Sequence, residues 1–461
     1  MAWWWAVSLL WSSVVLLHVW SGAAGPSFRA SRSLDSFSLR GGSADARGES
    51  LLNPAHERMD ADVLVIGAGP GGSVAGSLLA RSGRRVIALE AATFPRFQIG
   101  ESLLPRCNDI LDEAGLLPAV VARGYQVKNA ALFLQGAQRE RFCFGEVFPG
   151  QRTQTFQVPR SDFDQTLATA ARAHGVDVRF SHCVSAVEFL PDEVQVTATD
   201  LESQMSVRLR ARFVLDCSGY GRVLPRLLKL ERPSVLAPRL ALFTWVEADE
   251  RPPGDAEGDI WICIHPRGPW AWIIPFSNGR TSVGLVMQRS VYDGASGCDR
   301  DRLFSLLRED DNARRRLKGA SPVLKTVKLE GWSAAVDRLY GPGWAVTGNA
   351  AEFLDPVFSS GVTLALESAS CAAKLIHRSL NGERVDWETE YAAVVGKAVG
   401  VFRVFVRSWY AGDLPRLLML KNKTNSLKRA ITAILGGYVL DPENPFVRDP
   451  EGALSALLKL A

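Results

Sequence analysis

Residues 60–90, DADVLVIGAGPGGSVAGSLLARSGRRVIALE, constrain the fold more than any other part of the chain. An apolar strand runs into a glycine-rich turn, a helix of small residues follows, and a second strand ends at Glu90. In such a unit Gly67 makes the turn, Gly69 lets the backbone approach a pyrophosphate, and Gly72 lets the helix pack closely on the strand. The helix N-terminus then faces the phosphates, and Glu90 accepts hydrogen bonds from a ribose. We therefore predict a dinucleotide-binding βαβ unit.

The composition is that of a globular protein with a large core. Of the 461 residues, 47% are hydrophobic and 22% are charged, which argues against disorder. The formal charge of +4 is small and the Lys and Arg residues are spread out, so nucleic acid is not an expected partner. The seven cysteines are scattered, with no CxxC pair and no nearby histidine cluster, so we predict neither a metal site nor a disulfide framework.

The N-terminus is typical of a targeting segment. Residues 1–24 contain an apolar run followed by small residues and are predicted to be a signal peptide. The run is nearly long enough to span a bilayer, so an uncleaved anchor is the alternative and the only membrane attachment indicated. Residues 25–58 are rich in Ser and Arg without hydrophobic periodicity and are predicted to be a disordered, transit-like segment.

This leader resembles the two-part plastid leader of algae with complex plastids, in which a signal peptide is followed by a residue such as Phe28 and a Ser/Arg-rich tract. The chain is therefore expected to enter the secretory route and to reach a plastid. The alternative destination is secretion or the endomembrane system, where Asn422 of NKT would be a glycosylation acceptor.

Three further stretches separate FAD from NAD, which the glycine turn alone does not. They are residues 159–180, 213–224 and 344–369. Their order resembles that of flavoprotein monooxygenases of the hydroxybenzoate-hydroxylase fold. The resemblance implies an α/β fold in which a Rossmann-like FAD-binding domain is interleaved with a β-sheet substrate domain over residues 59–385. Residues 386–461 have apolar residues at helical spacing and are predicted to add C-terminal helices.

The same resemblance implies further flavin-binding residues. Arg160 is expected near the flavin, and Val362 is expected to contact the cofactor. Asn349 stands where the family usually places an acid on the ribityl chain. Its amide can still hydrogen-bond a hydroxyl, but it brings no charge, so we expect a change in flavin affinity or potential.

The stretch PWAWIIP contains a WxWxIP pattern at Trp270, Trp272, Ile274 and Pro275. This pattern resembles the signature of flavin-dependent halogenases. Two rigid indoles and two isoleucines would wall off the flavin, so that an organic substrate and bulk water do not reach an oxidant formed there. The alternative is a buried strand whose tryptophans fill the core.

The segment DPVFSSGVTLA, residues 355–365, is similar to the halogenase segment that cradles flavin and halide together. Ser360 and Gly361 match the family positions whose backbone amides hold chloride. The alternative is an ordinary helix N-cap, and both interpretations can hold at once. Phe358 stands where tryptophan-specific halogenases usually carry Glu, so free tryptophan is not the expected substrate.

Lys128 lies in YQVKNAALFLQG, residues 125–136, which reads as a strand with the lysine among apolar residues. It falls where halogenases place their catalytic lysine. Burial would lower its pKa from about 10.4. The lysine would then donate a hydrogen bond to hypohalous acid or attack it to give a haloamine. The alternative is an ordinary solvated lysine.

The halogenase resemblance covers roughly residues 60–375 and implies a function. Reduced FAD, oxygen and chloride or bromide would give hypohalous acid for electrophilic halogenation of an electron-rich aromatic, small or carrier-bound. A separate flavin reductase is expected as partner, since one nucleotide site is evident. GESLLP and QVKNAALF also resemble geranylgeranyl reductases, so that activity or a monooxygenase is the alternative. A flavin-binding protein without turnover is the non-enzymatic alternative, which Asn349 keeps open.

Overall fold

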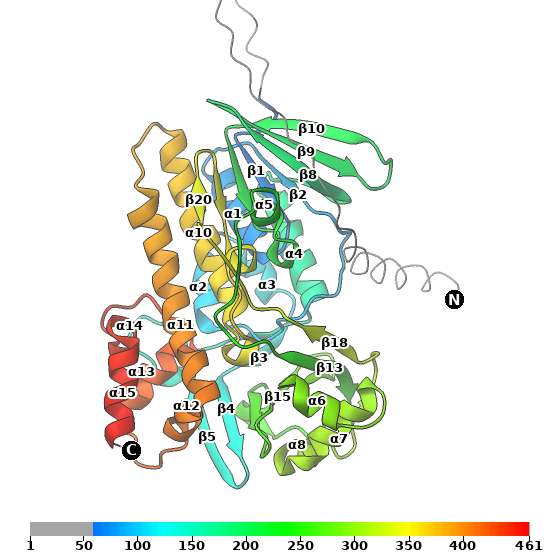
Figure 1. Cartoon of the computed structure of the whole chain (residues 1–461), viewed down its shortest axis with the longest axis vertical. Coiled ribbons are helices and arrows are strands. Elements are labelled where there is room, and N and C mark those ends of the chain that lie inside the picture. The colour runs from blue at the N-terminus through cyan, green and yellow to red at the C-terminus, as the bar shows by residue number, and fades with distance from the viewer. Residues whose placement is uncertain (1–58, 461) are drawn as a thin grey trace, which may run out of the picture. The chain divides into compact units, whose positions relative to one another are not determined.

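The computed structural model describes residues 59–460, and the signal peptide and transit-like segment expected over residues 1–58 lie outside them. The six-stranded sheet contains the predicted βαβ unit (Figure 1). Its strands, in spatial order, are β20 (Tyr340–Gly341), β21 (Trp344–Val346), β11 (Phe213–Asp216), β1 (Val63–Ile66), β2 (Val86–Leu89) and β7 (Asp177–Arg179). All neighbours pair in parallel except β20 with β21. Near-continuous apolar runs form these strands because both faces are covered.

Helices cover one face of this sheet. Helix α1 (Pro70–Arg81) follows β1 directly and packs against α4 (Arg160–Ala173) and α10 (Ser360–Leu380). Helices α2 (Pro105–Glu113) and α3 (Leu117–Val121) continue this layer. The other face meets a three-stranded meander of β8 (His182–Phe189), β9 (Val194–Asp200) and β10 (Ser206–Ala211).

The second sheet has eight strands. They are β17 (Ser321–Pro322), β13 (Leu240–Glu247), β16 (Arg280–Met287), β15 (Trp270–Pro275), β14 (Ile260–Ile264), β4 (Ala130–Gln135) and β5 (Gln138–Cys143) in order, with β18 (Val327–Glu330) beside β13. Strands β4 and β5 come from the chain between β2 and β7, and the others come from between β11 and β20. The chain thus leaves the first sheet for the second sheet twice and returns each time. This path confirms the predicted interleaved α/β fold.

Each face of the second sheet has its own cover. Helices α6 (Arg289–Gly294), α7 (Asp299–Glu309) and α8 (Asp311–Arg316) lie on one face, where Leu303, Leu306 and Leu307 pack on the strands. The opposite face, which carries Trp270 and Trp272, belongs to the large core that includes α10 and the C-terminal helices. Two-stranded pairs β3 (Gln126–Lys128) with β6 (Thr155–Gln157) and β12 (Glu231–Pro233) with β19 (Ala334–Val336) connect the two parts.

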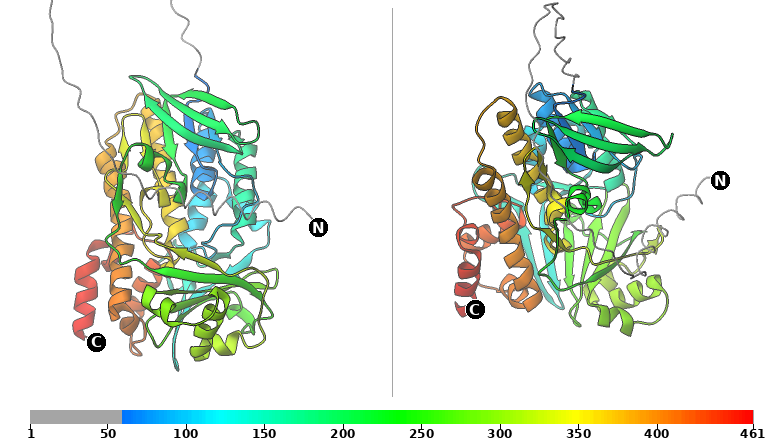
Figure 2. Two further views of the ribbon diagram at one scale, coloured as in Figure 1. Left: turned by 45° about the vertical axis from the view of Figure 1, so that its right-hand side comes forward. Right: turned by 45° about the horizontal axis from the view of Figure 1, so that its top comes forward.

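The C-terminal region is helical, as predicted. It comprises a π-helical turn (Glu388–Ala392), α11 (Ala393–Ala411), α12 (Asp413–Leu418), α13 (Asn425–Leu435), α14 (Pro445–Arg448) and α15 (Pro450–Leu460). Figure 2 shows α11 running beside α10 and down to the end of the β4–β5 hairpin. One face of α11 is buried at helical spacing, through Val395, Val399, Phe402, Phe405 and Trp409. Of the helices in the described residues, none combines the length and hydropathy needed to span a bilayer.

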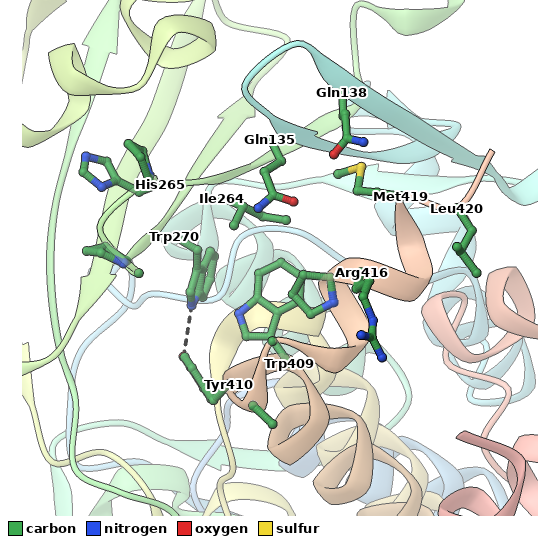
Figure 3. Close-up of a pocket in the computed structure, with 16 residues that line it drawn as sticks. Gln135, Gln138, Ile264, His265, Trp270, Trp409, Tyr410, Arg416, Met419 and Leu420 are labelled. Carbon is green, nitrogen blue, oxygen red and sulfur yellow. Dashed lines mark hydrogen bonds between the residues drawn. The ribbon is translucent and has the colours of Figure 1, made fainter. Parts of the chain in front are cut away.

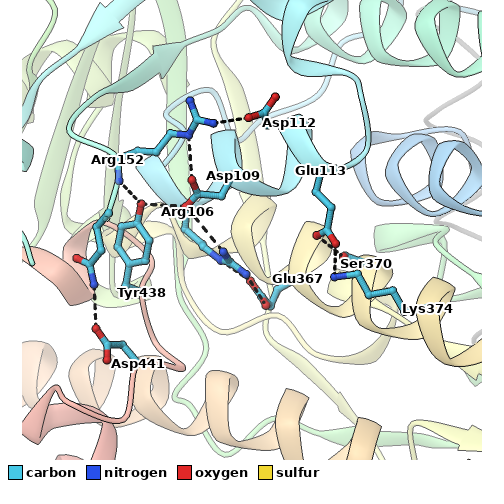
Figure 4. Close-up of polar contacts among 11 residues, drawn as sticks. Arg106, Asp109, Asp112, Glu113, Arg152, Glu367, Ser370, Lys374, Tyr438 and Asp441 are labelled. Carbon is cyan, nitrogen blue, oxygen red and sulfur yellow. Dashed lines mark hydrogen bonds and ion pairs between the residues drawn. The ribbon is translucent and has the colours of Figure 1, made fainter. Parts of the chain in front are cut away.

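Polar contacts fasten the C-terminal segment to α2 (Figure 4). The Tyr438 hydroxyl accepts a hydrogen bond from Arg152 N at 2.6 Å and donates to Asp109 Oδ2 at 3.0 Å. Gln151 Nε2 donates to Asp441 Oδ2 at 2.9 Å. These contacts join residues about 300 positions apart, so the C-terminal helices are part of the core structure and not an appendage.

Candidate active site

Two glycines at the turn between β1 and α1 stand where no side chain fits. Gly67 has φ +96°, and a Cβ there would lie 2.7 Å from Cys217 O. A Cβ at Gly72 would lie 1.9 Å from Gly67 O. Gly69 is the N-cap of α1 and supplies no side-chain cap, so amides of the first helical turn remain available to a ligand. The predicted roles of these three glycines agree with this geometry.

Arg96 is a site residue that the sequence analysis missed. A Cβ at Gly69 would lie 3.4 Å from Arg96 Nη2, so the guanidinium group stands beside the N-terminus of α1. Arg96 pairs with Glu90 at 3.7 Å and, through Nη1, with Asp164 Oδ2 at 3.1 Å, although the Nη1 contact lacks hydrogen-bond geometry. A guanidinium group beside an uncapped helix N-terminus fits the pyrophosphate of FAD.

Glu90 follows β2 directly, as predicted, and is 8% exposed. Its two carboxylate oxygens accept hydrogen bonds from Ala68 N at 2.9 Å and Ala92 N at 3.1 Å. The carboxylate therefore holds the glycine turn to the end of β2. Each oxygen has further lone pairs, so the position also suits a ribose hydroxyl.

Arg160 and Val362 lie beside Gly100, and Asn349 lies beside Gly361. Arg160 Nη1 donates to Ile99 O and Gly100 O, and the rest of the guanidinium group pairs with Asp164. A Cβ at Gly100 would lie 3.0 Å from Arg160 Nη1 and 4.0 Å from Val362 Cγ2. Asn349 lies in α9 (Gly348–Ala351), with its Oδ1 3.7 Å from a Cβ at Gly361.

The segment from Asp355 to Gly361 forms a tight turn into α10. Asp355 Oδ1 accepts a hydrogen bond from Val357 N at 3.1 Å, and Ser359 has φ +56°. Ser360, which is 2% exposed, begins the 21-residue helix α10, and its N-cap Ser359 makes no side-chain cap bond. The free backbone donors of a buried helix N-terminus favour an anion, so Ser360 and Gly361 suit the predicted halide contacts.

Trp270 and Trp272 lie on one face of β15, with ring centroids 5.9 Å apart and exposures of 2% and 5%. Trp272 Nε1 donates to Ser282 Oγ at 3.1 Å. The predicted wall is wrong in one detail: Ile273 points to the opposite face and packs toward α7, because side chains alternate along a strand. Ile274 stays with the indoles. The whole strand is buried, so the core-packing interpretation also holds.

Lys128 is the last residue of β3 and is 1% exposed, as its apolar surroundings predicted. Its Nζ donates to Ser102 Oγ at 2.9 Å and to Leu103 O at 2.8 Å, and lies 5.4 Å from the Phe144 ring centroid. Burial lowers the pKa of Lys128 from 10.5 to about 7. The alternative of a solvated lysine is therefore wrong.

Glu101 is a second residue that the sequence analysis missed, although its motif GESLLP was noted. The side chain is 1% exposed, and Trp245 Nε1 donates to its Oε1 at 2.8 Å. Burial raises the pKa of Glu101 from 4.5 to about 7, while hydrogen bonding from Ser282 and Trp245 acts in the opposite direction. Since Ser282 also binds Trp272, this carboxyl group lies against the tryptophan strand.

A cavity of about 610 Å³ lies between the end of the β4–β5 hairpin and the α11–α12 corner (Figure 3). Trp270, Trp409 and Tyr410 form part of its wall, with Gln135 and Arg416 among the other lining residues. Lys128 does not line it and stands at the opposite end of β4 from Gln135. The structure therefore brings Trp270, but not Lys128, to this cavity.

Comparisons with known proteins identify the family of the chain. The model of the family described as FAD binding domain matches residues 60–393. A brominase of pyrrole-2-carbonyl groups on a peptidyl carrier protein, from Pseudoalteromonas luteoviolacea, is 28% identical over 83% of this chain and 93% of its own length. The flavin-dependent halogenase armH1 of Armillaria mellea is 32% identical over 71% of this chain and 67% of its own length.

Among solved structures, a flavoprotein/dehydrogenase from Cytophaga hutchinsonii is 42% identical, with a TM-score of 0.84 over 87% of this chain and 98% of that one. It shares the fold from the glycine turn to the C-terminal helices. The family model covers the segments that supply the glycine turn, Lys128, the tryptophan strand and the turn before α10. The chain belongs to the flavin-dependent halogenases, within the wider family of FAD-binding-domain proteins.

Proposed function

We propose that this halogenase transfers chlorine or bromine, taken from chloride or bromide, to an electron-rich aromatic compound, and that Lys128 holds the electrophile for this transfer. The single observation that carries the proposal is the setting of this lysine. Among the described residues no ion pair involves Lys128, whose Nζ instead contacts a hydroxyl and a carbonyl oxygen in a buried site. A buried lysine without a carboxylate partner lowers stability, and such groups concentrate at reactive sites.

The residues of the site divide the work of the reaction. Bound in its reduced form, FAD would give two electrons to oxygen while the halide gives two more, so that hypohalous acid and water form. The amides of α1 and the Arg96 guanidinium group would hold the pyrophosphate, and Arg160, Val362 and Asn349 would lie along the flavin. The backbone donors at Ser360 and Gly361 would hold the halide. Trp270 and Trp272 exclude water because both indoles are buried and hydrogen-bonded.

Lys128 then acts on the electrophile in one of two ways. As an ammonium ion it donates a hydrogen bond to the oxygen of hypohalous acid. The ring carbon bonds to the halogen, the halogen–oxygen bond breaks, and hydroxide leaves as water with the lysine proton. The resulting amine takes the proton released by the ring. As a neutral amine, Lys128 instead attacks the halogen, the halogen–oxygen bond breaks, and hydroxide leaves as water with a proton of the amine. The ring carbon then bonds to the halogen of the haloamine, the nitrogen–halogen bond breaks, and the nitrogen takes the proton released by the ring.

The expected partners and address are part of the proposal. Phe358 and the carrier-bound substrates named for the pyrrole-modifying relative favour a small or carrier-bound aromatic. One glycine-rich βαβ turn occurs in residues 59–460, which favours reduction of FAD by a separate reductase. The leader sequence favours entry into the secretory route and delivery to a plastid, with secretion as the alternative.

One observation favours a second candidate function. The solved structure that is 42% identical is described as a flavoprotein/dehydrogenase, and that description names no halide. A monooxygenase or a reductase resembling geranylgeranyl reductase would use the same FAD site without a halide. A flavin-binding protein without turnover would need the FAD site alone.

The test needs no knowledge of the substrate. Residues 59–461 are expressed, bound flavin is reduced, and the protein is mixed with oxygen in the presence and absence of chloride or bromide. Halide-dependent formation of trappable hypohalous acid, or of a haloamine on Lys128, is the expected result. If halide changes nothing while NADPH with a prenyl or phenolic compound does, the halogenase proposal fails and the second candidate replaces it. If neither the halide nor NADPH with an organic compound has an effect, and oxygen reoxidises the bound flavin slowly, the result would favour a flavin-binding protein without turnover.

A further inference from the structure

Tyr410 connects three parts of the molecule that are distant in sequence. It is the penultimate residue of α11, beyond the residues 60–393 that the family model matches. Trp270 Nε1 donates a hydrogen bond to the Tyr410 hydroxyl at 3.0 Å, drawn in Figure 3, and this hydroxyl donates to Asp355 Oδ2 at 2.8 Å. The guanidinium carbon of Arg239 lies 3.4 Å from the centroid of the tyrosine ring and fixes its plane.

Asp355 is the first residue of the turn that leads to the candidate halide contacts. The side chain is 3% exposed, so its carboxyl group depends on protein donors. Its Oδ1 accepts from Val357 N, which shapes the single turn of 3₁₀ helix from Pro356 to Phe358. Its Oδ2 accepts from Tyr410, with Arg239 as the nearby cation. The hydroxyl of Tyr410 thus provides one of the two hydrogen bonds described for this carboxyl group.

The same end of α11 also packs on the middle of this turn. The Phe358 ring meets Trp409 edge-on at 5.8 Å and Phe405 at 6.1 Å between centroids. The turn therefore has an apolar contact and a polar contact with one helix. Both lie within a few residues of Ser360, where the backbone donors of α10 begin.

We infer that Tyr410 is a positioning residue for the halide: its hydroxyl orients Asp355 and so holds the turn from Asp355 to Ser360 in its binding shape. The inference rests on the proposed function, because it concerns the halide contacts at Ser360 and Gly361. It assigns to the C-terminal helix a share in a site whose other residues come from the FAD-binding region.

The variant Tyr410→Phe keeps the ring between Arg239 and the core and removes only the hydroxyl. Tyr438→Phe is the matched control. Tyr438 also belongs to the C-terminal region, and its hydroxyl also donates to an aspartate, Asp109 of α2. Two readouts are compared: bromide binding, followed by the fluorescence of bound oxidised FAD, and amide hydrogen exchange in peptides covering residues 355–362. The exchange measurement needs neither halide nor turnover.

Tyr410→Phe removes two hydrogen bonds, the one to Asp355 and the one from Trp270, and is expected to raise the bromide dissociation constant by roughly tenfold and to speed exchange in residues 355–362. Tyr438→Phe is expected to change neither. Unchanged exchange in Tyr410→Phe would overturn the inference. If the wild-type protein shows no response to bromide, the halide site itself fails, and the exchange data still decide whether Tyr410 holds the turn.

A second variant covers the case in which Tyr410→Phe does not fold. Asp355→Asn leaves one acceptor oxygen for two donors, Val357 N and the Tyr410 hydroxyl, so it is expected to loosen the same peptide. Where both variants fold, the double variant is expected to show little more exchange than either single one, because both changes break one contact. Additive effects would mean that Tyr410 and Asp355 act separately, contrary to the inference.

Discussion

Lys128 Nζ donates a hydrogen bond of 2.9 Å to Ser102 Oγ, and Ser102 follows the buried carboxyl group of Glu101 in the chain. Leu103 O provides the second acceptor, at 2.8 Å. Arg160 holds the backbone of the preceding residues, Ile99 and Gly100. The short segment from Ile99 to Leu103 therefore connects a flavin-site arginine to the candidate catalytic lysine, and it fixes the lysine without neutralising its charge.

Replacing Lys128 with Ala is expected to lower the amount of halogenated product by about a hundredfold or more, while flavin oxidation continues. The reason is that Lys128 is assigned to hold the electrophile and not to bind FAD. Product and flavin are measured in the same reaction. Lys423→Ala is the control, because Lys423 is also nearly buried, donates to Leu418 O and lies beside Phe142. Equal product from the Lys128 variant would contradict the assignment.

The pH dependence of halogenation separates the two roles of Lys128. Its pKa of about 7 means that the ammonium form prevails below pH 7 and the amine above it. If the ammonium ion donates to hypohalous acid, product formation per oxidised flavin falls as the pH rises through 7. If the amine attacks, product formation rises over the same range. A profile that is flat from pH 6 to 8.5 would mean that the protonation state of Lys128 does not control the step.

Local patterns in the sequence predicted the parts of the site that depend on local structure. The glycine turn, the strand that ends at Glu90 and the inward-facing Lys128 all follow from periodicity and residue type over a few positions. Arg96, Glu101 and Tyr410 were missed because Asp164, Trp245 and Asp355, which contact them, are distant in the chain. Trp245 binds Glu101 across 144 positions, and Tyr410 reaches Asp355 across 55. No periodicity in the sequence predicts such a contact. The contact is needed because a polar group that becomes buried requires a hydrogen-bond partner.

Glu101→Gln is expected to stabilise the protein at pH 8 and not at pH 4. Burial raises the pKa of Glu101 from 4.5 to about 7, so the folded protein binds the proton more tightly than the unfolded chain. Stability from this group therefore falls as the pH rises from 4.5 to 7 and stays low above it. A neutral amide avoids this loss, by up to about 3 kcal/mol at pH 8.

Urea unfolding at the two pH values measures this difference. Glu257→Gln is the control, because Glu257 is exposed and its neutralisation should change stability equally little at both. A Glu101→Gln variant that is less stable than the wild type at pH 8 would show that the carboxylate is stabilised in the folded state, contrary to the expected shift.

Asn349→Asp is expected to tighten FAD binding several-fold. A carboxylate would accept the ribityl hydroxyl in a charge-assisted hydrogen bond, which is roughly twice as strong as the bond to a neutral amide. Fluorescence titration of the apoprotein with FAD gives the dissociation constant. Asn278→Asp, in an exposed turn, adds the same charge away from the site and should leave it unchanged. Weaker binding in Asn349→Asp would place Asn349 away from the ribityl chain.

Gly284→Ala is expected to displace the Trp272 indole. Gly284 pairs with Trp272 across β15 and β16, and a Cβ there would lie 2.2 Å from the indole ring. The tryptophan must move and lose its bond to Ser282, which costs about 2 kcal/mol or more in unfolding free energy. Less product per oxidised flavin should accompany this loss, because a displaced indole admits water.

Gly396→Ala is the control, since Gly396 is exposed on α11 with open space around it. This change should stabilise the protein by about 0.5–1 kcal/mol. If both variants keep full stability and product yield, the packing of Trp272 against Gly284 does not shield the site.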